Sequence, residues 1–142
     1  MPGGLGTRTE IKNHKLVYFV AAQARSCQAI IAVCTGAFIL HAAGLLHGKR
    51  ATTHWASLGR LRDLPDVTVV EARYVQDGNI WTSAGISAGI DVSLALIADQ
   101  AGEEIAARVQ LATEYYPAHK LYAAPGENPQ VPIYIKRVAG PA

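Results

Sequence analysis

Cys34 is the residue of this sequence best placed to do chemistry. It follows the apolar run AIIAV, and Thr35 and Gly36 come directly after it. The run is short, continuous and rich in β-branched residues, which predicts a buried strand. Residues 36–46 predict an apolar helix that stops at Gly48. A turn from strand to helix holds a thiol over the helix N-terminus, where the dipole favours the reactive thiolate.

Two interpretations of Cys34 stay open on spacing alone. In the first, the strand, Cys34, Thr35 and the following helix form a nucleophile elbow, although not of the G-x-S-x-G form. The N–H of Thr35 then faces the same pocket and helps to hold a developing negative charge. In the second, Cys34 is one more small apolar residue, because free cysteine is among the most buried residue types. The other cysteine, Cys27, is expected to be structural.

His54 and two glycines are the candidate partners of this thiol. His54 ends the strand candidate RATTH and could reach the same sheet edge, where it would stabilise a thiolate or move protons. A hydrogen-bonded structural histidine beside Trp55 fits the same sequence. Gly3 and Gly4, in the glycine-rich start, could offer backbone N–H groups to an oxyanion, or form a plain turn.

The elements that must position these residues alternate along the chain. We expect a helix over residues 11–26, a short helix over 55–63, a hairpin over 67–83 with its turn at Asp77-Gly78, and a buried helix over 88–98 that is apolar nearly all round. One face of the first helix carries Leu16, Phe19, Val20 and Ala24, and a last helix runs from Glu103 to Pro117 with the stripe Ile105, Val109, Ala112 and Tyr116. Strands alternating with helices predict an α/β fold with a parallel-centred sheet, which binds ligands at the carboxyl ends of its strands. We expect one domain over residues 1–117 and an extended, proline-rich tail over 118–142.

The charge and the cysteine content of the chain exclude several classes of function. The 142 residues carry a formal net charge of +2, and no strong Lys/Arg run argues for a nucleic-acid partner. Two cysteines make no disulfide framework, so a reducing, cytoplasmic location is expected. The histidines and cysteines lack metal-ligand spacing, and we expect neither a metal nor a cofactor. The charge-free stretch 29–46 is interrupted by Cys-Thr-Gly and His41, which argues against a membrane span.

Three blocks of the sequence resemble a known family. PGGLGTR, AVCTGAFILHAAGLLHGKRATTHW and VQDGNIWTSAGISAGIDVSLALI are together similar to the ThiJ/PfpI superfamily, and most of all to its isonitrile hydratase branch and the related domains of AraC-type regulators. The resemblance implies a three-layer flavodoxin-like fold of the class I glutamine amidotransferase type, a small-molecule substrate and a homodimer. It assigns Cys34 as the nucleophile, Thr35 as its neighbour in the anion site, and His54 as a nearby histidine. It assigns Gly3 and Gly4 to the anion-binding loop, and Ala84, Gly85 and Ile86 to the loop that flanks the pocket.

One departure from the family pattern affects the expected activity. Met1 takes the place of the last residue of the strand that precedes the Pro-Gly-Gly loop, so the pattern looks truncated at its N-terminus. The missing portion carries, in the isonitrile hydratase branch, an acidic residue that works with the nucleophile, and Asp91 is better interpreted as a dipole or capping group. Three hypotheses follow: an isonitrile hydratase-like enzyme, a non-catalytic ligand-binding domain, and an inactive truncated member.

Overall fold

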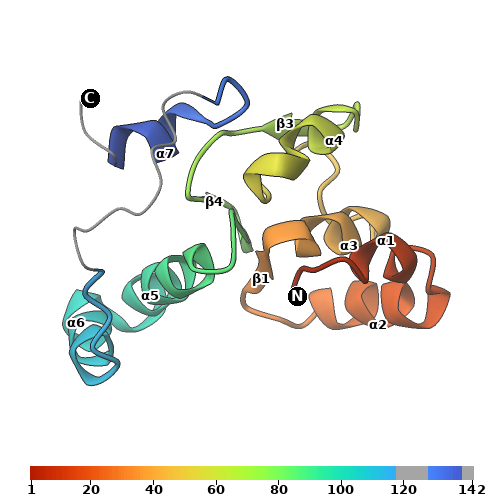
Figure 1. The fold of residues 1–142 in the computed structure, drawn as a ribbon. Helices are drawn as coiled ribbons and strands as arrows, with labels where there is room; N and C mark the ends of the chain where they lie inside the picture. Colours follow the sequence, from red (N-terminus) through yellow and green to blue (C-terminus); the bar gives the residue numbers. More distant parts are fainter. Residues whose placement is uncertain (118–127, 139–142) are drawn as a thin grey trace.

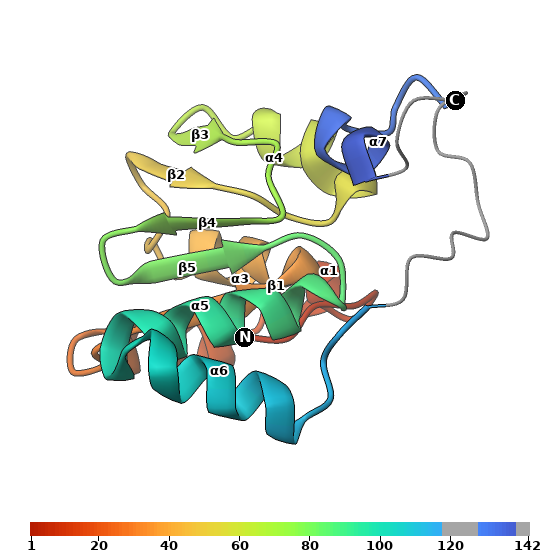
Figure 2. The ribbon, with the colours of Figure 1, turned by 90° about the vertical axis from the view of Figure 1, so that its left-hand side faces the viewer.

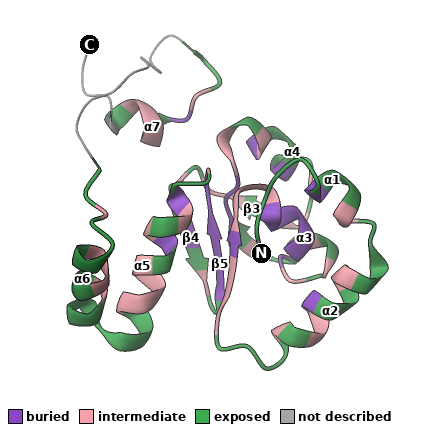
Figure 3. Ribbon diagram, turned by 60° about the horizontal axis from the view of Figure 1, so that its bottom comes forward, coloured by how far each residue is buried: buried purple, intermediate pink, exposed green. Residues whose placement is uncertain are grey.

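The strands of this protein lie between two layers of helices. The computed structural model describes residues 1–117 and 128–138. Helices α1 (Thr7–Glu10), α2 (His14–Ala24) and α3 (Ala37–Ala42) cover one side of the strands, and α5 (Ala88–Ala101) and α6 (Glu103–Ala112) cover the other (Figure 1, Figure 3). This arrangement confirms the three-layer, flavodoxin-like α/β fold predicted from the sequence.

The central sheet brings the end of β1 beside the end of β5. Its strand order is β1 (Ile30–Val33), β5 (Ile80–Ser83), β4 (Tyr74–Asp77), with β1 and β5 parallel and β4 antiparallel to β5. Val33 pairs with Ser83, so the residues that follow the two strands leave the sheet at the same edge. Cys34 and the loop that begins at residue 84 therefore start side by side.

A second pair of strands extends the layer beyond β4. Strands β2 (Lys49–Ala51) and β3 (Val67–Val69) pair in parallel, and Figure 2 shows β3, β2, β4 and β5 following one another. Side chains join β2 to β4: Asp77 accepts from the Arg50 N–H at 2.9 Å and from Lys49 Nζ at 3.2 Å. Those two bonds lower the pKa of Asp77, the Arg50 N–H contributing most.

The single hairpin expected over residues 67–83 was wrong in its first half. Only β4 and β5 form the hairpin, around Gly78 at φ +64°, whereas β3 pairs with β2. The Val70 N–H donates to the Ala51 carbonyl at 2.9 Å, so the chain stays on β2 until residue 70 and then crosses to β5. A continuous β-rich sequence does not reveal such a change of partner, because both halves have the same side-chain alternation.

The core lies on the α3 side of the sheet. Ala37, Phe38, Ile39 and Leu40 of α3 are buried together with Ala32, Leu46, Ala51, Leu61 and Ile80. Helix α2 contributes Val20, but Phe19 is 59% exposed, so the expected apolar face of that helix was wrong at this position. Helix α5 was expected to be buried, yet only Ala88 and Val92 are. Its other apolar residues are partly open because α6 covers one flank alone.

Several element bounds also differ from the expected ones. The helix expected over residues 11–26 is the shorter α2, and α1 before it was not expected. The Asn13 side chain caps α2 by accepting from the Leu16 N–H at 3.3 Å. Two expected helices begin with a 3₁₀ turn: η1 (Cys34–Gly36) precedes a shorter α3, and η2 (Trp55–Ser57) precedes α4 (Leu58–Arg62). Helix α6 ends at Ala112, before the expected end at Pro117, and α7 (Ile133–Val138) forms in the tail that was expected to be extended. Residues 118–127 and 139–142 of that tail lie outside the described residues. The domain boundary at residue 117 stays a prediction.

Candidate functional site

Cys34 follows β1 directly and begins η1 in a strained conformation. Its φ is +59°, a left-handed conformation that non-glycine residues seldom adopt and that recurs at functional sites. Val33, just before it, is extended at φ −102° and ψ 134°, and Gly36, just after it, is helical at φ −57° and ψ −24°. The change from strand to helix is therefore completed at Cys34, as the elbow interpretation requires.

Two glycines allow the N-terminal loop to lie against this turn. A Cβ on Gly3 would stand 2.7 Å from the Cys34 Cβ and 2.7 Å from the Thr35 nitrogen. A Cβ on Gly36 would stand 2.5 Å from the Met1 carbonyl oxygen. Both distances are too short for real atoms, so only glycine fits at either position. The loop is also held from its first residue, since the Met1 amino group donates to the Ile31 carbonyl and the Met1 carbonyl accepts from the Val33 N–H at 2.9 Å.

The Thr35 side chain fastens the loop to the elbow. Its hydroxyl accepts from the Gly4 N–H at 2.9 Å and donates to the Gly4 carbonyl at 3.1 Å. The buried Thr7 also donates to that carbonyl, at 2.8 Å. Because the Gly4 N–H is already bonded, its predicted part in an anion site requires that bond to be shared, and it stays a prediction.

Thr53 is a site residue that the sequence did not reveal. Thr53 lies in the segment that follows β2, and its hydroxyl donates to the Cys34 carbonyl at 2.8 Å. The bond fixes the peptide that leads out of the strained residue. Thr52 next to it donates its N–H to Thr82 Oγ1 at 2.9 Å, which ties the same segment to β5. The signal in the sequence is two adjacent threonines before His54, a pair that is compatible with any strand.

His54 lies beyond β2 and faces the loop after β5. The strand ends at Ala51, so the expectation that His54 ends it was wrong by three residues; the chain leaves the ladder early because Thr52 bonds to a β5 side chain instead. His54 Nδ1 accepts from the Ala56 N–H at 3.2 Å, which assigns the proton of the neutral ring to Nε2. A Cβ on Gly85 would lie 3.4 Å from the His54 ring carbon Cδ2. His54 and Gly85 therefore adjoin, and Thr53 connects them to Cys34.

A cavity of about 510 Å³ opens beside the thiol. It is lined by Met1, Pro2, Gly3, Gly4, Val33, Cys34 and Ile86. Four predicted site residues thus meet there: Gly3, Gly4, Cys34 and Ile86. Ala84 is buried below the loop, while Gly85, Thr35 and His54 stand around the elbow outside this lining. Cys27 is exposed on the loop after α2 and does not line this cavity.

The site also contains a buried hydroxyl, and Asp91 is engaged elsewhere. Ser83 Oγ, at the end of β5, has no hydrogen-bond partner among the described residues. Asp91 accepts from Arg73 Nε at 2.6 Å and from the Tyr115 hydroxyl at 3.2 Å, so it is an anchor for α5 rather than a free acid. Within residues 1–117 and 128–138, no three His, Cys, Asp or Glu side chains gather as a metal site.

The elbow, the glycine loop and the sheet order agree with one protein family. The family model described as DJ-1/PfpI family matches residues 1–99. The chain belongs to the DJ-1/PfpI family. Its similarity to a ThiJ/PfpI family protein from Pseudomonas syringae has a TM-score of 0.78 at 32% identity and covers 96% of this chain and 55% of that one. This confirms the superfamily resemblance drawn from the three sequence blocks.

Two curated relatives within this comparison differ in what they do. Isonitrile hydratase of Pseudomonas putida is 44% identical over 118 residues, which are 83% of this chain and 51% of the relative. The HTH-type transcriptional regulator GbdR of Pseudomonas aeruginosa is 35% identical over 108 residues, 75% of this chain and 29% of the regulator. This DJ-1/PfpI chain thus spans about half the length of the hydratase and less of the regulator. Among its described helices, none is long and apolar enough to cross a bilayer.

Proposed function

We propose that this DJ-1/PfpI chain carries the cysteine nucleophile of an enzyme that adds water to an isonitrile. This is the reaction that the name of its relative, isonitrile hydratase, describes. The observation that carries the proposal is the left-handed conformation of Cys34 at the end of β1, next to an apolar cavity. A structural cysteine has no need of that strain, whereas a nucleophile gains an exposed sulfur above a helix start. The 44% identity to the hydratase supports the choice of substrate class.

The proposed reaction balances without oxidation or reduction. The Cys34 thiolate attacks the terminal carbon of R–N≡C, a C–S bond forms, and a proton added to that carbon gives the thioimidate R–N=CH–S–Cys34. Water then adds to the same carbon, a proton moves to nitrogen, and the C–S bond breaks. The products are the N-substituted formamide and the original thiolate. The apolar lining of the cavity suits the organic group R, because burial of apolar surface favours its binding.

His54 and the backbone at the elbow supply the other proposed roles. The Thr35 N–H would stabilise charge on the intermediate, as backbone donors in oxyanion sites do. With Nδ1 occupied by the Ala56 N–H, His54 would use Nε2 to deliver or accept protons. The chain would work in a reducing, cytoplasmic compartment, since Cys27 and Cys34 are both free thiols. We propose neither a nucleic-acid partner nor a cofactor.

The reactivity of Cys34 tests this proposal directly. Iodoacetamide should alkylate Cys34 faster than the exposed Cys27 in the same molecule at neutral pH, with an apparent pKa below the free value of about 8.5. Peptide mass spectrometry reads both sites at once. Formamide production from an alkyl isonitrile should be lost in Cys34→Ser and kept in Cys27→Ser. Equal alkylation of the two cysteines at neutral pH would contradict the nucleophile assignment.

A second candidate is a ligand-binding domain without turnover. The similarity to the regulator GbdR favours it, and the same cavity would hold the ligand. Cys34→Ser separates the two candidates, because an isonitrile-binding sensor should retain binding without producing formamide in either form. Hydration should also be measured with an upstream segment like that of the hydratase joined to Met1. Activity that appears only in the longer chain would show that this portion alone is the inactive form.

A further inference from the structure

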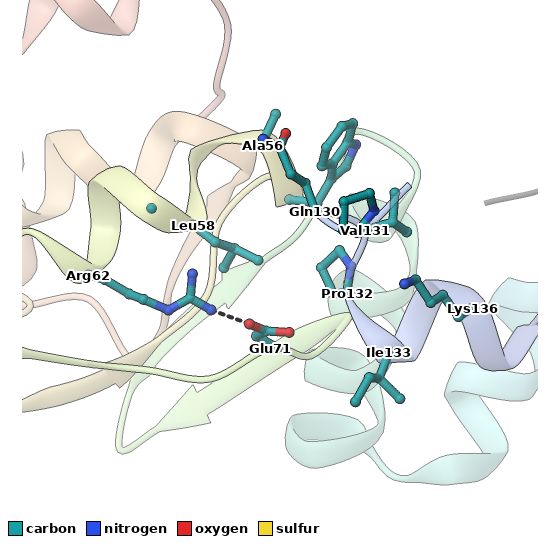
Figure 4. A pocket seen from close by; sticks show the side chains of 12 residues that line it. Ala56, Leu58, Arg62, Glu71, Gln130, Val131, Pro132, Ile133 and Lys136 are labelled. Carbon is teal, nitrogen blue, oxygen red and sulfur yellow. Dashed lines mark hydrogen bonds and ion pairs between the residues drawn. The ribbon is translucent and has the colours of Figure 1, made fainter. Parts of the chain in front are cut away.

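A second cavity is lined by Trp55, the residue after His54, and shares no lining residue with the Cys34 cavity. It measures about 500 Å³ and is formed between η2 with α4 on one side and residues 129–136 on the other (Figure 4). Its volume falls within the range of about 300–1,000 Å³ that is usual for small-molecule sites. The segment that closes it includes α7, so the site is made by two parts of the chain that are distant in sequence.

Apolar side chains line part of this cavity. Trp55 and Leu58 form one wall, and Val131, Pro132 and Ile133 form the facing wall. Figure 4 shows Leu58, Val131, Pro132 and Ile133 grouped around the same opening. An aromatic ring and rigid prolines offer a broad surface at little cost in conformational entropy. The walls therefore suit a small hydrocarbon or aromatic group.

The cavity has one more positive than negative side chain, which favours an anionic ligand. Arg62 and Glu71 form an ion pair with each other, through one guanidinium nitrogen and one carboxylate oxygen. Lys136 lines the same cavity, and no carboxylate of the described residues is within ion-pair distance of it. Figure 4 shows its side chain reaching back along α7 toward Val131 and Pro132. One cation is thus left for a ligand, and a ligand cation would be repelled.

Helix α7 and the residues before it form the second wall of the cavity. Tyr134, one turn before the end of that helix, is half-buried, and burial raises the pKa of its hydroxyl. Pro132 at the helix start is buried as well. Asn128 holds the chain before it, accepting from the Gln130 N–H at 2.9 Å through its side chain. Lys136 is therefore carried by a helix whose Tyr134 is half-buried and whose preceding Pro132 is buried.

We propose that this cavity binds a small organic monocarboxylate, with its apolar body between Trp55 and Val131 and its carboxylate on Lys136. A single uncompensated cation matches one negative charge better than a phosphate, whose double charge usually requires several donors. The ligand is separate from the substrate of Cys34, because the two cavities have no lining residue in common. The site adjoins the catalytic region through the neighbouring rings of His54 and Trp55, whose centroids are 5.7 Å apart.

Tryptophan fluorescence provides the test, with benzoate as the probe. Trp81 is only 3% exposed, so a ligand-dependent change in emission reports on Trp55. Benzoate in low-salt buffer should change the emission with a saturable profile, whereas the neutral isostere benzamide should bind about tenfold or more weakly, a difference of about 1.4 kcal/mol. Lys136→Met should weaken benzoate to the level of benzamide, and added salt should weaken it further in the wild type.

The matched control is Arg137→Met on the same helix. Arg137 is exposed and does not line the cavity, so its loss should leave benzoate affinity unchanged. Cys34→Ser should also bind benzoate normally, so that failure here is distinct from failure of the proposed reaction. The inference is overturned if benzoate and benzamide bind equally, or if Lys136→Met binds benzoate as the wild type does. An equal loss in Arg137→Met would likewise overturn it, since the effect would then be one of general charge.

Discussion

At the scale of single residues, the elbow is a strained conformation held from both sides. The left-handed Cys34 costs of order 1–3 kcal/mol relative to ordinary backbone. Thr53 bonds to its carbonyl, and Thr35 bonds to the glycine loop on the other side. Gly3 and Gly36 let that loop approach. The strain persists because these contacts over-determine it, and the outcome is a fixed direction for the thiol.

Loss of the Thr53 hydroxyl should release this turn. In Thr53→Val the partly buried carbonyl of Cys34 keeps only the Ala37 N–H as a donor, and the loss of one hydrogen bond should lower the free energy of unfolding by about 0.5–1.5 kcal/mol. The Cys34 alkylation rate at neutral pH should fall toward that of Cys27, because the sulfur is no longer directed over the helix start. Thr53→Ser should restore the rate. A variant that is destabilised but alkylates at the wild-type rate would show that Thr53 serves stability alone.

The glycine positions give a second residue-scale prediction. Gly36→Ala places a methyl group 2.5 Å from the Met1 carbonyl oxygen, and overpacking of this kind typically costs 1–3 kcal/mol. Gly6→Ala is the matched control, because its φ is −58° and no atom lies within 4 Å of the added methyl. Urea unfolding should show Gly36→Ala destabilised and Gly6→Ala unchanged or slightly more stable. Equal effects of the two substitutions would contradict the close approach.

The sequence pattern found some of these residues and missed others for a physical reason. Cys34 and Gly36 stand out because they interrupt an apolar run, and a break in such a run marks a turn. No such break marks Thr53, because its role depends on the folded chain bringing it against Cys34, which is distant in sequence. His54 was placed too near the strand end because a hydrogen bond from Thr52 to a β5 side chain ends β2 early.

At the scale of elements, the pairing of the strands could not be predicted from the sequence. The existence of β1, of the β4–β5 hairpin and of the helices around them follows from apolar periodicity and from the Asp77-Gly78 turn. The transfer of the chain from β2 to β5 between β3 and β4 follows from hydrogen bonds that close only in the folded state. The same holds for α7, whose six residues are too few to form a stable helix without a surface to dock on.

One carboxylate joins several elements and makes stability depend on pH. Asp66, just before β3, accepts from His41 of α3 at 2.9 Å and from His47 of the following loop at 3.0 Å. These bonds, that of His41 first, lower the pKa of Asp66 from 3.8 to about 2. A folded-state pKa below the unfolded one stabilises the fold above the unfolded value and loses that contribution as the carboxylate is protonated. The loss should therefore occur as the pH falls from about 4 to about 2.

Urea unfolding between pH 5 and pH 2 measures this contribution. Asp66→Asn should be less stable than the wild type at pH 5, and the difference should shrink as the pH approaches 2. Asp63→Asn, at an exposed position nearby, serves as the control and should follow the wild-type pH profile. If Asp66→Asn keeps the full acid dependence of the wild type, the His–Asp contacts do not stabilise the fold.

At the scale of the whole molecule, the two helical layers are unequally covered. The α3 side holds the buried core, whereas an apolar groove of about 440 Å³ runs between α5 and α6 on the other side, lined mainly by Val33, Ile86, Ile90, Leu94, Ile97 and Val109. Ile86 is 85% exposed, Leu111 66% and Ile90 44%. Composition indicated such a surface through the low share of charged residues, 17%. The sequence could not say which side it lies on, because α5 is apolar nearly all round.

We expect a second copy of the chain to cover this face, as the family resemblance implies for a homodimer. Contiguous exposed apolar surface of this kind usually marks an interaction site. Ile90→Asp puts a charge in the middle of the groove and should shift the chain from dimer to monomer in sedimentation velocity. Phe19→Asp, at a somewhat more exposed apolar position on α2 across the sheet, should leave the dimer intact. A wild-type chain that is monomeric at every concentration, or a dimer lost equally in both variants, would contradict self-association through α5.

The oligomeric state also affects the site at Cys34, because Val33 and Ile86 line both this groove and the thiol cavity. A partner seated on the groove would therefore form part of the wall around the substrate, and Ile90→Asp should change the KM for an isonitrile along with the oligomeric state.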